Sequence, residues 1–88
     1  MKVIKFGAIW CPACLIMRPR YNKVLNNYTD IENIEYDYDM DSDMVDKYKV
    51  GKILPEAIIL DDNNNEQIRI IGEVKEEEIL NIISKYRK

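Results

Sequence analysis

The sequence predicts an α/β fold in which the elements follow the order βαβαββα and form a sandwich around a mixed four-stranded sheet. Apolar residues recur at every second position in some segments and at three- to four-residue intervals in others, which are the periods of strands and helices. The chain has 88 residues, of which 47% are hydrophobic. That length suffices for one compact core and not for two, so we expect a single domain over residues 1–88.

The first half of the chain is expected to begin with a strand and a helix. Residues 2–9 alternate and are rich in β-branched and aromatic side chains, which favours a strand. A helix is expected to start at Pro12, because proline is well tolerated at the first helical position. Pro19 lies inside this helix and should bend its axis. Cys14 extends the apolar face of the helix and should point inward. That face consists of Met17, Tyr21, Val24, Leu25 and Tyr28.

A second strand and a short helix are expected next. Residues 34–40 alternate strictly between apolar and acidic side chains, which is typical of a half-buried strand. The apolar face of this strand would consist of Tyr36, Tyr38 and Met40. Asp41 or Ser42 is expected to cap a short helix that ends near Tyr48.

The second half of the chain is expected to form a hairpin and a last helix. Residues 57–60 are a continuous apolar run, as in a buried strand. Residues 61–65 contain only Asp and Asn, which favour a turn, and residues 67–71 would return as an antiparallel strand. The final helix would bury one apolar face. That face consists of Ile79, Ile82, Ile83 and Tyr86.

Composition and charge exclude several classes of function. The chain has 13 Lys and Arg, 16 Asp and Glu, and no histidine. We therefore expect no nucleic-acid partner, because no basic field is present to collect phosphates. The absence of histidine excludes His-dependent triads and His-ligated zinc or haem. The sequence also lacks a signal-like or membrane-spanning apolar run, so we expect a cytoplasmic protein with no membrane partner.

The most informative motif is the pair Cys11 and Cys14 at the junction of the first strand and helix. Cys11 would lie at the helix N-terminus, where free backbone N–H groups and the helix dipole favour a thiolate. Cys14, one turn later, could attack a mixed disulfide formed at Cys11. We therefore interpret Cys11 as the nucleophile and Cys14 as the resolving residue of a redox-active disulfide.

Two other interpretations of the cysteine pair are weaker. A purely structural disulfide across so short a loop would contribute only about 2 kcal/mol in the chain-entropy model. A metal site would need ligands from a second chain, because structural zinc takes four. We expect no metal.

The residues around this motif resemble the thioredoxin superfamily. Trp10 precedes the first cysteine as in thioredoxins, Pro19 stands five residues after the second, and Pro55 follows the first by 44 residues. Gly72 resembles the glycine that lines the family's substrate groove. The resemblance covers essentially the whole chain, without the extra N-terminal strand and helix of full-length thioredoxins. It implies the minimal thioredoxin fold.

The resemblance also implies a substrate site. Pro55 would be the family's cis-proline, which presents the Leu54 backbone beside Cys11 for an extended substrate segment. The substrate-binding residues would be Trp10, Pro12, Ala13, Leu54, Pro55 and Gly72. Other interpretations stay open at this point: Pro55 as a simple strand breaker, Trp10 as a core aromatic residue, and Gly72 as an ordinary strand end.

Four positions depart from the family's pattern. Pro12-Ala13 replaces the usual Gly-Pro between the cysteines, which leaves the direction of electron flow open. Lys5 stands where thioredoxins carry a buried aspartate. We expect the Lys5 side chain to extend its aliphatic stem to the surface. The alternative is that its positive charge stabilises the Cys11 thiolate and so tunes the pKa of Cys11. Glu56 replaces the usual threonine after the cis-proline and could disfavour acidic substrates.

Together these observations predict a monomeric thiol–disulfide oxidoreductase that reduces protein disulfides without a bound cofactor. Its partners would be disulfide-containing proteins and a reductase or thiol donor that the sequence does not identify. A glutaredoxin-like enzyme is the nearest alternative, although Gly72 is followed by Glu73 and not by the second glycine common in that family. The other alternative is a non-catalytic redox sensor or binding module, in which the acidic stretch 30–46 would recruit a basic partner.

Overall fold

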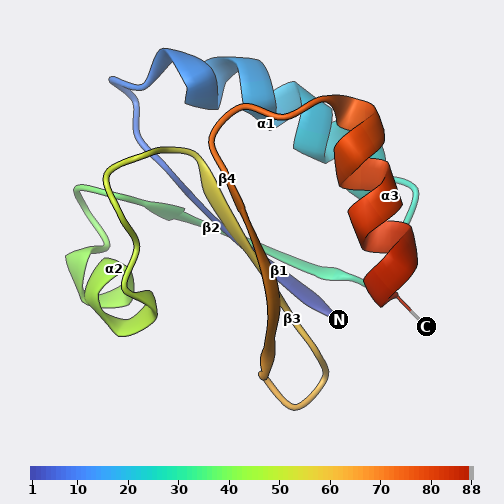
Figure 1. Cartoon of the computed structure of the whole chain (residues 1–88). Coiled ribbons are helices and arrows are strands. Elements are labelled where there is room, and N and C mark those ends of the chain that lie inside the picture. Colours follow the sequence, from blue (N-terminus) through green and yellow to red (C-terminus); the bar gives the residue numbers. More distant parts are fainter. Residues whose placement is uncertain (88) are drawn as a thin grey trace.

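The computed structural model describes residues 1–87 and has the predicted order of elements (Figure 1). Residue 88 of the predicted domain lies outside the described residues. The elements are β1 (Lys2–Gly7), α1 (Pro12–Leu25), β2 (Glu32–Asp37), α2 (Ser42–Tyr48), β3 (Glu56–Leu60), β4 (Glu66–Ile71) and α3 (Glu76–Tyr86). The α/β fold class is confirmed.

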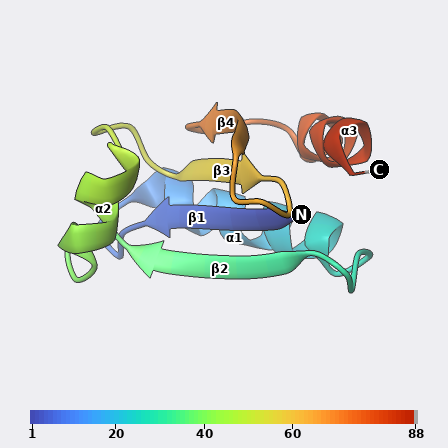
Figure 2. The ribbon, with the colours of Figure 1, turned by 90° about the horizontal axis from the view of Figure 1, so that it is seen from below.

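The four strands form one mixed sheet in the order β2-β1-β3-β4. β1 pairs with β2 in parallel and with β3 antiparallel, and β3 pairs antiparallel with β4. Helices α1 and α3 cover one face of the sheet, whereas α2 covers the other (Figures 1 and 2). β1 is therefore a central strand with helix on both faces, and it leads directly to the cysteine motif.

Alternation along the strands divides the buried side chains into two clusters. In β3, Ala57 and Ile59 pack with α1 and α3, whereas Ile58 and Leu60 pack toward α2. Successive side chains of a strand point to opposite faces, so one short strand serves both cores. Burial of all five β3 residues confirms the prediction of a buried strand.

Helix α1 begins at Pro12, as predicted, and Pro19 lies inside it. Its inward face consists of Cys14, Met17, Tyr21, Val24 and Leu25. The helix ends at Leu25, so Tyr28 lies beyond it and packs only partly buried against the same core. The inward orientation predicted for Cys14 is confirmed.

The prediction for residues 34–40 was wrong at its C-terminal end. β2 ends at Asp37, and Met40 is 83% exposed instead of facing the core. The cause is local hydrogen bonding, because the Asp37 carboxylate accepts bonds from the backbone N–H groups of Asp39 at 2.9 Å and Met40 at 3.0 Å. Such bonds favour a turn over a continuing strand.

The expected capping of α2 was also wrong, although the helix itself is confirmed. Asp41 occupies the N-cap position, but its carboxylate accepts a 2.8 Å hydrogen bond from the backbone N–H of Asp37 and makes no cap bond. Asp41 therefore closes the turn after β2.

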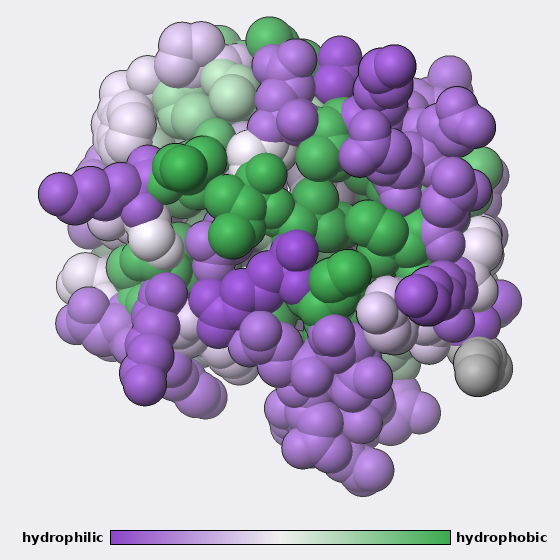
Figure 3. Space-filling view, viewed as in Figure 1, coloured by the Kyte–Doolittle hydropathy of each residue, from purple (hydrophilic) through white to green (hydrophobic). Residues whose placement is uncertain are grey.

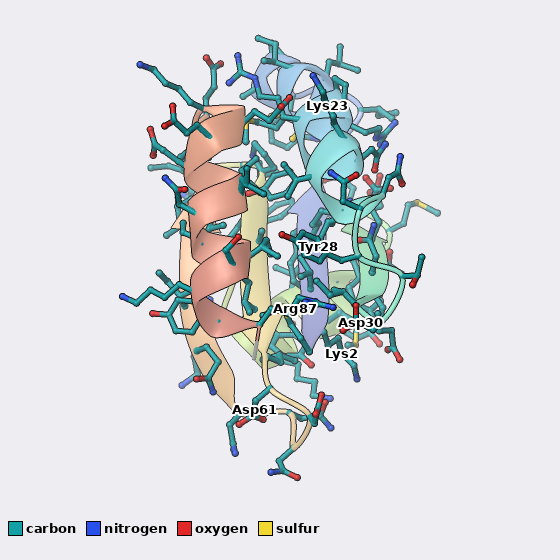
Figure 4. All side chains as sticks on the ribbon, turned by 90° about the vertical axis from the view of Figure 1, so that its right-hand side faces the viewer. Lys2, Lys23, Tyr28, Asp30, Asp61 and Arg87 are labelled. Atoms are coloured by element: carbon teal, nitrogen blue, oxygen red, sulfur yellow. The ribbon has the colours of Figure 1, made fainter. Side chains whose placement is uncertain are left out.

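Arg87, just after α3, contacts the loop between α1 and β2 (Figure 4). Its guanidinium lies 2.9 Å from an Asp30 carboxylate oxygen and 4.8 Å from the centre of the Tyr28 ring. The hydrogen bond from Arg87 lowers the pKa of Asp30 below its usual value. The pair is exposed, so it contributes little to stability.

No helix within residues 1–87 has the length and apolar character needed to cross a membrane.

Glu56 and Arg69 form an ion pair beneath the loop that precedes β3. Glu56 is 2% exposed, and its carboxylate oxygen lies 2.8 Å from an Arg69 nitrogen. Arg69 also binds the Glu66 carboxylate at 2.8 Å and approaches the Lys49 carbonyl at 3.5 Å. The pair joins β3 to β4 directly after Pro55, and so fixes the strand that carries this proline.

We predict that Arg69→Met lowers the free energy of unfolding by about 3 kcal/mol, because it leaves the Glu56 carboxylate buried without a partner. Urea unfolding would measure the change. The double variant Glu56→Gln/Arg69→Met is the matched control, and it should recover much of the loss. Equal losses in the single and double variants would contradict this explanation.

Candidate active site

Cys11 is the N-cap residue of α1. Its sulfur accepts a hydrogen bond from the backbone N–H of Cys14 at 3.3 Å. This is the geometry of a helix N-cap, in which a side-chain acceptor satisfies an otherwise free N–H group. Negative charge on the Cys11 sulfur would be stabilised by that N–H group and by the positive end of the helix dipole.

Cys14 lies one turn into α1 and is 9% exposed. A Cβ atom on Gly7 would lie 3.5 Å from the Cys14 sulfur, so β1 passes close beside this residue. Burial, followed by the hydrogen bond with Cys11, raises the pKa of Cys14 to about 11. Cys14 is therefore a protonated thiol at neutral pH, and it has to lose that proton before it can act as a nucleophile.

Leu54 and Pro55 lie directly before β3, and the Leu54 carbonyl faces Cys11. The peptide bond between them is cis, as the family resemblance implied. The Cys11 sulfur lies 3.6 Å from the Leu54 carbonyl oxygen, which confirms the expected position of the Leu54 backbone.

Gly72 lies opposite Pro55. Its N–H donates to the Pro55 carbonyl at 2.8 Å, and its φ of +78° lies in the left-handed region, which favours glycine. The sequence therefore needs glycine here for backbone conformation.

Trp10 lies at the surface beside Cys11 and is 57% exposed, so the interpretation as a core aromatic residue is wrong. Its indole N–H donates to the Asp39 carboxylate at 2.7 Å, and its ring meets Tyr38 edge-on at 6.4 Å. Sequence reasoning missed Asp39 as a partner. The acidic run was visible, but no local signal pairs residues that are 29 positions apart.

The remaining predicted groove residues lie around Cys11. Pro12 is exposed at the first turn of α1, and Ala13 packs partly buried in the α2-side cluster. Exposed apolar side chains extend the surface, among them Ile9 at 87%, Ile53 at 65% and Ile71 at 51%. Figure 3 shows apolar surface running from the loop before β3 across the upper part of β4.

Lys5 does not reach the surface, contrary to our expectation. It is 6% exposed, and its Nζ lies 5.7 Å from the centre of the Tyr21 ring. β1 is the second strand of four, and α1 covers the face that Lys5 shares with Val3 and Gly7, so the stem has no open path to water. Burial lowers the pKa of Lys5 below its usual value, although Glu35 partly opposes this shift.

Glu56 was expected to influence acidic substrates, and this expectation was wrong. Its side chain is buried and bound to Arg69, so it presents no free charge to the groove. Among residues 1–87, no group of three or more His, Cys, Asp or Glu side chains is arranged to hold a metal ion. The chemistry available at this site is that of two adjacent thiols.

Comparison with known proteins decides the family. The Thioredoxin family model matches residues 1–85. The chain belongs to the thioredoxin family. It is 29% identical over 84 residues to a thioredoxin of Ophiophagus hannah, covering 96% of this chain and 77% of that protein.

Solved thioredoxins share the fold. A thioredoxin from Nicotiana alata aligns with a TM-score of 0.88 at 31% identity, covering 99% of this chain and 73% of that one. Thioredoxin 1 of Thermosipho africanus aligns with a TM-score of 0.85 at 27% identity, covering 98% and 93%. This thioredoxin-family protein is a thiol–disulfide oxidoreductase, consistent with the closeness of Cys11 and Cys14.

We predict that Lys5→Met stabilises the protein at pH 7 and flattens the pH dependence of its stability. The folded-state pKa of Lys5 is lowered from 10.5. The unfolded chain therefore binds more protons between the lowered value and 10.5, and stability should rise with pH in that window. Urea unfolding from pH 7 to 10 would measure the slope, with the exposed Lys47→Met as control. An unchanged slope in Lys5→Met would contradict the prediction.

Proposed function

We propose that this protein reduces disulfide bonds in other proteins, with Cys11 as the attacking residue and Cys14 as the resolving residue. The observation that carries the proposal is the position of the Cys11 sulfur at the N-terminus of α1. It lies 3.3 Å from the Cys14 N–H group and 3.6 Å from the Leu54 carbonyl oxygen. This position supports a single sulfur that carries charge, meets its resolving partner and approaches a bound substrate.

The proposed reaction has two exchange steps. The Cys11 thiolate attacks one sulfur of the substrate disulfide, forms a mixed disulfide and releases the other sulfur as a thiolate. Deprotonated Cys14 then attacks the Cys11 sulfur, which forms the Cys11–Cys14 disulfide and releases the second substrate thiolate. The protein dithiol loses two electrons and the substrate disulfide gains them.

The substrate is proposed to bind as an extended segment. Its backbone would pair with the backbone of Leu54, as peptides pair with a free strand edge. The other groove residues would be Trp10, Pro12, Ala13, Pro55 and Gly72. Support comes from their arrangement around Cys11 and from the exposed apolar side chains beside them.

The working context is also part of the proposal. A dithiol reductant has to be reduced again after each turnover, which favours a reducing compartment, the cytoplasm, and a separate reductase or thiol donor. We propose a monomer that acts as one domain over residues 1–88, because the apolar surface around Cys11 has to stay open to substrate. Two thiols carry the electrons, so no bound cofactor is invoked.

We predict that Cys11→Ser and Cys14→Ser each lower the reduction of insulin disulfides by at least about 10²-fold, with different products. Cys14→Ser should accumulate a mixed disulfide through Cys11, because no resolving thiol remains. Mass spectrometry of the trapped species would measure this. A stable mixed disulfide in Cys11→Ser, and none in Cys14→Ser, would reverse the assigned roles.

The reduction potential of the pair should lie near that of a reducing thioredoxin, about −270 mV. Equilibration against glutathione redox buffers, with the disulfide fraction measured by alkylation, would give the value. A potential above about −200 mV would instead favour a glutaredoxin-like or oxidising role. Weak turnover with glutathione and glutathione reductase is expected in parallel.

A further inference from the structure

β2 forms one edge of the sheet, and Figure 2 shows no other segment of residues 1–87 beyond it. The Glu32 N–H group donates to the Met1 carbonyl at 3.1 Å, so the even-numbered residues of β2 bond to β1. Alternate residues of a paired strand direct their N–H and C=O groups to opposite sides. The backbone groups of Asn33 and Glu35 therefore point outward, away from β1.

The free edge is short, because local hydrogen bonds close its C-terminal end. The Asp37 N–H group donates to the Asp41 carboxylate at 2.8 Å, and the Asp41 N–H group donates to the Asp37 carbonyl at 2.8 Å. Outside the β1–β2 ladder, no hydrogen bond among residues 1–87 involves the backbone of Asn33 or Glu35. These two residues thus offer unpaired donors and acceptors to an added strand.

The side chains of β2 differ between the two faces of the sheet. Ile34 and Tyr36 are partly buried and extend the apolar cluster on the α2 side. Glu35 lies in register with Lys5, on the face that α1 covers, and Asp37 shares that face. A strand added at this edge would therefore place apolar side chains beside Ile34 and Tyr36, and polar side chains beside Glu35.

A cavity of about 260 Å³ lies beside the C-terminal half of β2. Its lining includes three carboxylates and one guanidinium, those of Glu35, Asp37, Asp41 and Arg18. Glu35 lies 3.3 Å from Arg18, whereas Asp37 and Asp41 have no Lys or Arg within ion-pair distance among residues 1–87. The cavity thus has an excess of negative charge, which a long cationic side chain would complement.

The negative charge decides between the possible occupants of this edge. Charged side chains on an edge strand discourage pairing with a second copy of the same strand. Two β2 strands side by side would bring together Glu32, Glu35 and Asp37 of both copies, and like charges across a strand pair are destabilising. A basic strand would reverse the sign of that interaction. The edge therefore fits a basic partner and disfavours self-pairing.

We propose that the outer edge of β2 binds an extended, basic segment of a partner protein as a fifth strand of the sheet. The segment would alternate basic and apolar residues, with one basic side chain in the cavity and apolar side chains beside Ile34 and Tyr36. Its backbone would bond to the N–H groups and carbonyls of Asn33 and Glu35, as in other β-strand additions. Neither cysteine takes part, so the inference is independent of the redox roles proposed above.

A synthetic peptide tests this proposal. An acetylated and amidated Lys-Val-Lys-Val-Lys-Val-Lys peptide would be titrated into the isotope-labelled protein, and the backbone amide signals would be followed by NMR. The control peptides are Glu-Val-Glu-Val-Glu-Val-Glu and a peptide of the same Lys and Val content with all its lysines in one block. The protein variants are Asn33→Pro and Glu35→Gln, with Glu77→Gln on the exposed side of α3 as the matched control.

The alternating Lys peptide should shift the amide signals of Asn33 and Glu35 and slow the exchange of their N–H protons with solvent. Asn33→Pro should weaken binding by about 10-fold, because proline removes an outward donor. Proline is tolerated there, since that N–H group makes no bond to β1. Glu35→Gln should weaken binding by about 3-fold, as for an exposed ion pair, and Glu77→Gln should have no effect. The amide spectra show whether each variant is folded, so either edge variant decides if the other fails to fold.

Several outcomes would overturn the proposal. One is that the alternating Lys peptide leaves Asn33 and Glu35 unaffected at millimolar concentration, or shifts the signals of β4 or of the groove around Cys11 instead. Equal binding of the acidic peptide would contradict the role of charge, and equal binding of the block peptide would contradict strand pairing. Shifts of Asn33 and Glu35 that follow the protein concentration alone would mean that a second copy of the chain occupies the edge.

Discussion

The structure of the site depends on one capping interaction, the hydrogen bond from the Cys14 N–H group to the Cys11 sulfur. At 3.3 Å it places a sulfur where helices usually carry a hydroxyl or carboxylate oxygen. β1 directs the chain to this point, and Pro12 starts the helix immediately after it. The interaction that stabilises the start of α1 is therefore also the one that would stabilise a thiolate on Cys11.

The second constraint is the packing of β1 between two layers. As a central strand it places Lys5 and Gly7 against α1, next to the inward face that carries Cys14. Gly7, Lys5 and Cys14 line the same small cavity. The two buried charges of the described chain thus differ in kind: Glu56 is paired with Arg69 and fixes the strands, whereas Lys5 has no carboxylate within ion-pair distance among residues 1–87.

Much of this site follows from the sequence because its signals are local. The spacing of Cys11 and Cys14, the proline at the start of α1 and the apolar period of the helix together predict a nucleophile at a helix terminus with an inward partner. Strand alternation failed after Asp37, because its carboxylate accepts hydrogen bonds from the following backbone N–H groups, which ends β2 and turns Met40 to solvent. Whether a side chain binds the backbone N–H groups in place of a neighbouring strand depends on local geometry. The alternation of apolar residues does not predict it.

The sequence by itself determined the order of the elements, the α/β class and the cysteine pair, because periodicity and helix-start chemistry act over a few residues. Only the tertiary structure decided which distant groups meet: Trp10 with Asp39, the Cys11 sulfur with the Leu54 carbonyl, and Lys5 with the cavity beside Cys14. These contacts depend on strand order and on which face of β1 each helix covers. Neither feature is encoded in a local stretch of sequence, so the burial of Lys5 follows only from the tertiary structure.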